Sequence, residues 1–147
     1  MTNPGIIINE TGAQRLIGYV LDVTQGDGRA RCRLTLSDAH LNRHGVLHGG
    51  LAATLLDNAM GATASLTVDD TGRAPFLTIS CNTQYLAPAK PGRDVIATGR
   101  IAGGGKSLLF VEGELRDTDD RLIATASGVF KRVPASQIPA GQGAGDA

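Results

Sequence analysis

The strongest constraint on the fold is one long apolar run in the middle of the chain. From Gly50 to about Leu66 the sequence reads GLAATLLDNAMGATASL, with apolar residues around the whole circumference of a helix rather than along one stripe. We therefore predict a helix that is buried nearly all round. Asp57 lies inside this run, and an ionised carboxylate is costly to bury unless it is paired or hydrogen-bonded. Asp57 is thus either structural or functional, since such acids cluster at active sites but also occur elsewhere.

Strand patterns lie on both sides of this run. Residues 29–36, RARCRLTL, alternate apolar and polar, which is typical of a half-buried strand. We expect an earlier strand from Leu16, in LIGYVLDV. Four more strand candidates follow the helix, at residues 76–86, 94–102, 107–117 and 122–133. Because their connections are short and turn-like, neighbouring strands should be antiparallel. One helix among about six strands predicts an α+β fold, with the helix against one face of the sheet.

The length of 147 residues favours a single domain. We expect an N-terminal extension over residues 1–14 and a folded domain over residues 15–133. Residues 134–147 are rich in Gly, Ala and Pro, and this composition predicts a disordered tail.

Composition argues against several classes of function. Aromatic residues make up only 3% of the chain and Trp is absent, so a nucleic-acid binder that stacks bases is disfavoured. Lys+Arg and Asp+Glu number 14 each, which leaves no net charge to attract nucleic acid or an anionic membrane. No apolar run approaches the roughly 18 residues of a membrane span, and the N-terminus lacks a secretory signal pattern. We therefore expect a cytoplasmic protein, in which Cys32 and Cys81 are inert buried thiols.

Gly49 and Gly50 lie at the start of the predicted helix and leave backbone amides uncovered at its N-terminus. Those donors and the helix dipole favour negative charge, so a thioester or ester carbonyl that becomes an oxyanion would be stabilised there. Gly50 and Asp57 are seven residues apart, which is roughly 10 Å along a helix axis. That distance is too long for one helix to hold both the oxyanion and the attacking water. The spacing therefore predicts a site shared between two chains, most simply in a two-fold dimer.

These residues form a motif, N-x-x-G-x-x-H-G-G followed by an aspartate, that resembles the PaaI-like (phenylacetate-pathway type) hotdog-fold acyl-CoA thioesterases. The resemblance extends to APFLTISCNTQYLAPAKPG, with its Y-x-x-P-A-K-x-G turn, and to GGGKSLLF. It implies a hotdog fold, in which one long central helix is wrapped by a five- or six-stranded antiparallel sheet. It also implies a homodimer joined edge to edge with active sites at the dimer interface, or a dimer of dimers (a homotetramer). The motif residues are Asn42, Gly45, His48, Gly49, Gly50 and Asp57.

The resemblance implies a role for each matching position. Asp57 would be the general base that activates water, or else the nucleophile, and Thr78 on the following strand would position that water. The Gly49 amide would polarise the thioester oxygen, Asn42 would orient the thioester, and His48 would hold the loop. Asp57 and Thr78 would come from one subunit and the other three residues from its partner.

The same resemblance suggests where coenzyme A would bind. The reaction that the resemblance implies needs no metal or cofactor, and CoA is part of the substrate. Lys106 carries a point charge suited to phosphate, although an ordinary solvated lysine in a hairpin fits the sequence equally well. The candidate CoA-binding residues are Gly50, Gly104, Gly105, Lys106 and Ser107.

The sequence thus predicts an enzyme that hydrolyses a medium-chain or aryl-acyl-CoA to free acid and CoA. One alternative is a metal-dependent hydrolase, because His40, His44 and His48 are spaced like ligands on one helix face. Gly45 argues against a helix through this stretch, and we expect His40 and His44 at the surface. Another alternative is a non-catalytic acyl-CoA binding hotdog module. A hotdog dehydratase is less favoured, since its His/Asp or His/Glu arrangement is not found.

Overall fold

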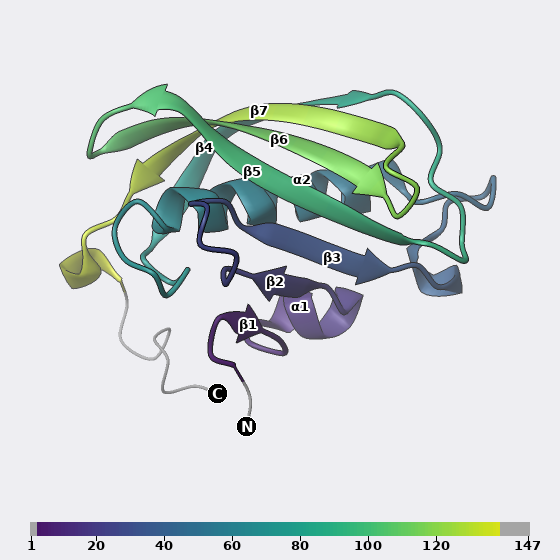
Figure 1. Ribbon diagram of the computed structural model, residues 1–147, viewed down its shortest axis with the longest axis horizontal. Coiled ribbons are helices and arrows are strands. Elements are labelled where there is room, and N and C mark those ends of the chain that lie inside the picture. The colour runs from purple at the N-terminus through teal and green to yellow at the C-terminus, as the bar shows by residue number, and fades with distance from the viewer. Residues whose placement is uncertain (1–2, 139–147) are drawn as a thin grey trace.

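The computed structural model describes residues 3–138 and contains one long helix against a curved antiparallel sheet (Figure 1). The elements in chain order are β1 (Ile6–Ile7), α1 (Gly12–Ile17), β2 (Val20–Asp22), β3 (Arg31–Thr35), the 3₁₀ turn η1 (Asp38–His40), α2 (Gly49–Ser65), β4 (Phe76–Tyr85), β5 (Asp94–Gly104), β6 (Leu108–Asp117), β7 (Leu122–Arg132) and the 3₁₀ turn η2 (Ala135–Gln137).

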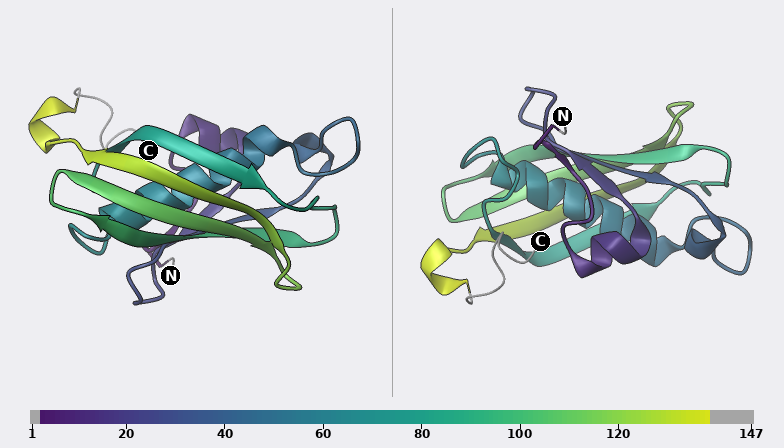
Figure 2. Two further views of the ribbon diagram at one scale, coloured as in Figure 1. Left: turned by 90° about the horizontal axis from the view of Figure 1, so that it is seen from above. Right: turned by 90° about the horizontal axis from the view of Figure 1, so that it is seen from below.

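The strands form one sheet with the order β1-β2-β3-β5-β6-β7-β4, and every neighbouring pair is antiparallel. The sheet curves around α2, which crosses it diagonally (Figure 2). The predicted α+β architecture is confirmed. The described residues contain seven strands rather than five or six, because the short strand β1 pairs with β2 inside the stretch expected to be an extension.

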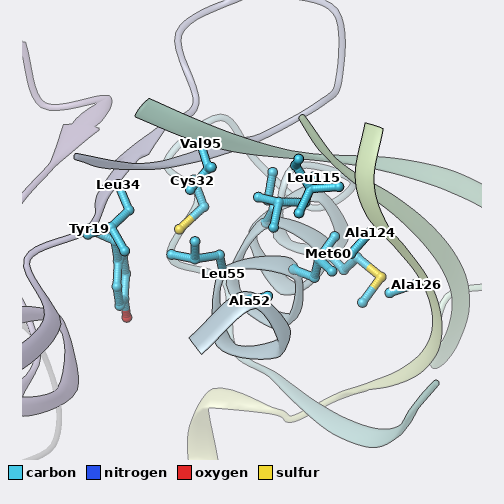
Figure 3. Close-up of a cluster of buried hydrophobic side chains, with 14 of the residues drawn as sticks. Tyr19, Cys32, Leu34, Ala52, Leu55, Met60, Val95, Leu115, Ala124 and Ala126 are labelled. Atoms are coloured by element: carbon cyan, nitrogen blue, oxygen red, sulfur yellow. The ribbon is translucent and has the colours of Figure 1, made fainter. Parts of the chain in front are cut away.

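The hydrophobic core lies between α2 and the inner face of the sheet (Figure 3). Leu55, Leu56 and Met60 of α2 have no exposed surface. Each fully buried leucine contributes roughly 1.5–3 kcal/mol to folding. On β3 the side chains of Cys32 and Leu34 are buried while the arginines between them are not, as the alternation predicted. The other buried strand residues of this core are Val95, Ala97, Leu109, Val111, Leu115, Ile123, Ala124, Ala126 and Phe130.

The prediction that α2 is buried all round is wrong along one strip of the helix. Thr54, Asp57, Asn58 and Gly61 are only half-buried, and their spacing of three, four and seven residues places them on one helix face. The sheet covers the opposite side of the helix and leaves this strip open. Asp57 therefore lies beside the core rather than within it, which removes the cost of burying an isolated charge.

The strand predicted from Leu16 is wrong in its first part, because Leu16 and Ile17 form the end of the short helix α1. The Thr11 hydroxyl caps α1 by accepting a hydrogen bond from the Gln14 amide, and Gly18 ends the helix with φ 91°. These start and stop signals override the strand propensity of the segment. The strand itself begins at Val20.

The predicted disordered tail, residues 134–147, begins with η2. The remainder, residues 139–147, lies outside the described residues, so its disorder stays a prediction. Among residues 3–138, no helix is long and apolar enough to cross a membrane.

Candidate active site

The candidate site centres on Asp57, on the open strip of α2. The Thr78 hydroxyl, on β4, donates a hydrogen bond to Asp57 Oδ1 at 2.7 Å. Within the described residues no other group donates to this carboxylate, so its second oxygen is free to accept a proton. The structure thus brings together the two residues that the sequence assigned to one half of the site.

Thr78 reaches Asp57 because of the way β4 pairs with β7. Thr78 lies opposite Phe130 and Tyr85 opposite Ala124, so both share the face of the sheet that is turned toward α2. Two residues that are seven positions apart, such as Thr78 and Tyr85, normally point to opposite faces of a strand. A β-bulge between Thr78 and Ser80 shifts the register and restores the common face.

The N-terminus of α2 forms the second half of the predicted site. His48 is the N-cap, and its Nδ1 accepts a hydrogen bond from the Gly50 amide at 2.9 Å. In a neutral ring this bond leaves the proton on Nε2. The Gly49 amide donates to no group in the part of the chain that the structure describes, so it is the available donor at this helix end.

Tyr85 is a site residue that sequence reasoning missed. Its hydroxyl, at the end of β4, donates to the Gly49 carbonyl at 2.8 Å. The ring also covers Gly49, because a Cβ atom added there would lie 3.3 Å from Tyr85 Cε1. Its position as the first residue of the Y-x-x-P-A-K block is the sequence feature that could have pointed to Tyr85.

Asn42 shapes the loop before α2. Its Oδ1 accepts hydrogen bonds from the amides of His44, at 2.9 Å, and Val46, at 3.3 Å. Its main chain also pairs with Val46, whose carbonyl accepts from the Asn42 amide at 2.8 Å. In this chain the side-chain oxygen therefore organises the loop, and its amide nitrogen donates to no group among residues 3–138.

The three histidines do not share a helix face. His40 ends η1, His44 lies in an exposed loop and His48 caps α2. The expectation of a surface His40 is wrong, because this side chain is buried: its Nε2 donates to the Ile17 carbonyl at 2.7 Å and its Nδ1 accepts from the Ser37 amide at 3.0 Å. With both ring nitrogens engaged, His40 is not a metal ligand. No cluster of three His, Cys, Asp or Glu residues in the described part of the chain could hold a metal.

The predicted CoA-binding hairpin connects β5 and β6. Gly104 has φ 111°, and a Cβ there would lie 2.8 Å from the Cα of Leu109, so only glycine fits this turn. Lys106 is exposed at its tip. Leu109 pairs with Phe130, which pairs with Thr78, so the hairpin extends from the same end of the sheet as Thr78.

The thiols of Cys32 and Cys81 differ in their exposure to solvent. The expectation that both are buried is wrong for Cys81, which is exposed on β4 opposite Gly128. Partial burial chiefly raises the pKa of the Cys81 thiol; the nearby Asp57 carboxylate adds to this, and a weak hydrogen bond with Thr83 opposes it. Cys32 is in the core, and burial raises its pKa far above the ordinary value.

One chain does not bring the predicted oxyanion donor and the predicted base together. Gly49 and Asp57 are eight residues apart on α2, about 12 Å along its axis. A hollow of about 810 Å³ exists, but it lies on the sheet face turned away from α2, and its lining includes neither Asp57 nor Thr78. Gly49 and Asp57 are therefore separated within one chain.

The helix wrapped by an antiparallel sheet, with a carboxylate held by a strand hydroxyl and an uncapped amide at the helix start, defines a hotdog-fold protein with a hydrolase-like site. Residues 44–124 match the sequence profile of the Thioesterase superfamily. Human acyl-coenzyme A thioesterase 13 is 35% identical over 112 residues, which cover 76% of this chain and 78% of that protein. The chain therefore belongs to the Thioesterase superfamily, and it is a thioesterase enzyme. Acyl-CoA thioesterase activity is supported as the activity of its family.

Solved structures agree with this assignment of the fold. The PaaI protein of the phenylacetic acid degradation operon of E. coli superposes with a TM-score of 0.70 at 21% identity, covering 84% of this chain and 86% of that one. Zebra fish thioesterase superfamily member 2 superposes with a TM-score of 0.70 at 26% identity, covering 86% and 89% of the two chains. The PaaI-like hotdog architecture is thus confirmed.

Proposed function

We propose that this enzyme hydrolyses an acyl-CoA to the free acid and CoA, with Asp57 as the general base and the Gly49 amide as the oxyanion donor. The observation that carries the proposal is the 2.7 Å hydrogen bond from Thr78 to Asp57 on the open strip of α2. That bond fixes one carboxylate oxygen and leaves the other free for water. Thioesters are activated acyl groups, so one base and one oxyanion donor suffice.

The proposed reaction has two steps. Asp57 Oδ2 takes a proton from water while the water oxygen bonds to the thioester carbonyl carbon, and the resulting oxyanion accepts the Gly49 N–H. The tetrahedral intermediate then collapses, the C–S bond breaks, and the sulfur receives from Asp57 the proton that was taken from water, while His48 Nε2–H is placed to donate a hydrogen bond to the leaving sulfur. Asn42 Nδ2, which has no partner among residues 3–138, is free to orient the thioester.

We propose that the site is completed by a second copy of the chain, in a homodimer or a dimer of dimers. The 12 Å between Gly49 and Asp57 requires one half-site from each subunit. Strand β4 ends the sheet and carries apolar side chains at its surface; Leu77 is 60% exposed and Ile79 is 59% exposed. Pairing of two β4 edges would cover these side chains and bring the two helices together.

The substrate is proposed to be a medium-chain or aryl-acyl-CoA. Gly50, Ala53 and Gly61 on or beside the open strip have little or no side chain, and Leu51 and Phe76 are half-buried apolar neighbours. These residues leave room for an acyl group of moderate size. The exposed Lys106 at the β5–β6 hairpin, with its neighbours Gly104, Gly105 and Ser107, supplies a positive charge for the CoA phosphates. Lys106→Gln should raise KM more than it lowers kcat.

Complementation between two inactive variants examines both the chemistry and the sharing of the site. Asp57→Asn removes the base with little change of shape. Gly49→Pro removes the amide donor, and proline is favoured at this first helical position. His48, with φ −60° and ψ 131°, already has the backbone that precedes a proline. Mixed dimers should regain turnover, because one of their two sites contains Asp57 from one chain and Gly49 from the other. Absence of recovery in mixed dimers of two folded variants would exclude a shared site.

Isotope labelling tests for a nucleophilic carboxylate. In a single turnover in H₂¹⁸O, a general base leads to label in the product acid only. Label on the Asp57 carboxylate would show that Asp57 forms a mixed anhydride that water opens at the aspartyl carbonyl, and this result would refute the general-base assignment.

A further inference from the structure

The peptide group between Gly49 and Gly50 is held at both ends. Its carbonyl accepts the Tyr85 hydroxyl at 2.8 Å, and its N–H donates to His48 Nδ1 at 2.9 Å. The Tyr85 ring lies over Gly49 at the same time, so close that a Cβ atom would be 3.3 Å from the ring. Glycine is the residue with the most backbone freedom, and here two hydrogen bonds and a ring remove that freedom.

These two hydrogen bonds act in series. A hydroxyl that donates to an amide carbonyl polarises the amide and makes its N–H a stronger donor. The Gly50 N–H is therefore a better partner for His48 Nδ1, which must stay unprotonated to accept it. The imidazole proton is consequently kept on Nε2, the nitrogen that is not engaged at the helix N-terminus.

We propose that Tyr85 is a positioning residue for the reaction: it holds the Gly49 amide in place as oxyanion donor and keeps His48 in the tautomer with the proton on Nε2. This inference rests on the proposed function. Tyr85 acts through Gly49 and His48 and does not contact the reacting atoms. Strand β4 thus fastens α2 at two points, with Thr78 bonded to Asp57 and Tyr85 bonded to Gly49, one at each half-site.

The kinetic comparison uses Tyr85→Phe, which keeps the ring and removes the hydroxyl. We expect kcat for acyl-CoA hydrolysis to fall roughly 3- to 10-fold, the range for loss of one hydrogen bond, with KM changed less than about twofold. The matched control is Thr125→Val. This variant removes a hydroxyl from β7 opposite Gln84, on the other face of the sheet, and should keep wild-type kcat. An unchanged kcat in Tyr85→Phe, or a loss carried by KM alone, would overturn the proposal.

The second readout does not depend on turnover. The ¹⁵N spectrum of imidazole-labelled protein should show His48 with an unprotonated Nδ1 and a protonated Nε2 in the wild type. Tyr85→Phe should shift His48 toward a mixture of tautomers, while the signals of His40 and His44 stay in place. A His48 spectrum that is identical in both proteins would refute the role of Tyr85. A wild type that hydrolyses no acyl-CoA would refute the proposed function instead, and the His48 spectrum would still decide whether Tyr85 controls the tautomer.

Discussion

Replacing Thr78 by valine removes the single hydroxyl that holds Asp57 while preserving the shape of the side chain. The hydrogen bond is 2.7 Å long and its acceptor is a carboxylate, a kind of bond worth about 1.5–3 kcal/mol. Thr78 is exposed in the described chain, so we take the lower end, about 1.5 kcal/mol. If the bond is fully used in the transition state, kcat should fall about tenfold. Valine favours strands, so β4 should remain folded.

The assay is release of free CoA thiol under saturating acyl-CoA, with circular dichroism to confirm folding. Thr78→Ser keeps the hydroxyl and should retain most activity. Asp57→Asn removes the base itself and should cost about 10²- to 10⁴-fold. The expected order of activity is therefore wild type, Thr78→Ser, Thr78→Val and Asp57→Asn. A loss in Thr78→Val as large as that in Asp57→Asn would mean that the leading role has been given to the wrong residue, and no loss at all would mean that the hydrogen bond plays no part in catalysis.

Two further predictions concern packing and the electrostatics of the site. Gly99→Ala should lower the free energy of unfolding in urea by about 3 kcal/mol, the upper range for overpacking. The added Cβ would clash with Thr63 Oγ1 and lie 2.8 Å from a main-chain oxygen of α2. A change below about 0.5 kcal/mol would contradict this close helix–strand contact. Alkylation at pH 8 should modify Cys81 and spare the buried Cys32. Because the Asp57 charge contributes to raising the pKa of Cys81, Asp57→Asn should lower that pKa and speed the reaction; an unchanged rate would place Asp57 too far from the thiol.

Much of the fold was predictable because most strands bury one face and α2 buries one side. The alternation in RARCRLTL and the apolar run of α2 gave boundaries within about two residues of those in the structure. The short elements α1 and β1 were not predicted, since a six-residue helix depends on its caps rather than on a hydrophobic period. The seventh strand of the sheet is β1, and its two residues are too few to show a recognisable hydrophobic alternation.

The site was predictable in part. Asp57 stood out by its chemistry, and its pairing with Thr78 followed from a resemblance that the structure supports with a hydrogen bond. Tyr85 could not be found from strand periodicity, because seven residues place it and Thr78 on opposite faces unless a bulge lies between them. His40 also escaped prediction, since its burial depends on the Ile17 carbonyl, which is 23 residues away in the sequence.

The most direct measurement is release of free CoA from a panel of short-chain, medium-chain, long-chain and aryl-acyl-CoAs, with wild type beside Asp57→Asn and a chelator present. We expect wild type to turn over a medium-chain or aryl-acyl member of the panel and folded Asp57→Asn to lose at least about 10²-fold in kcat. Equal turnover by the two proteins would contradict Asp57 as the catalytic base. Binding of acyl-CoA by wild type without any turnover would contradict hydrolysis and identify a binding module.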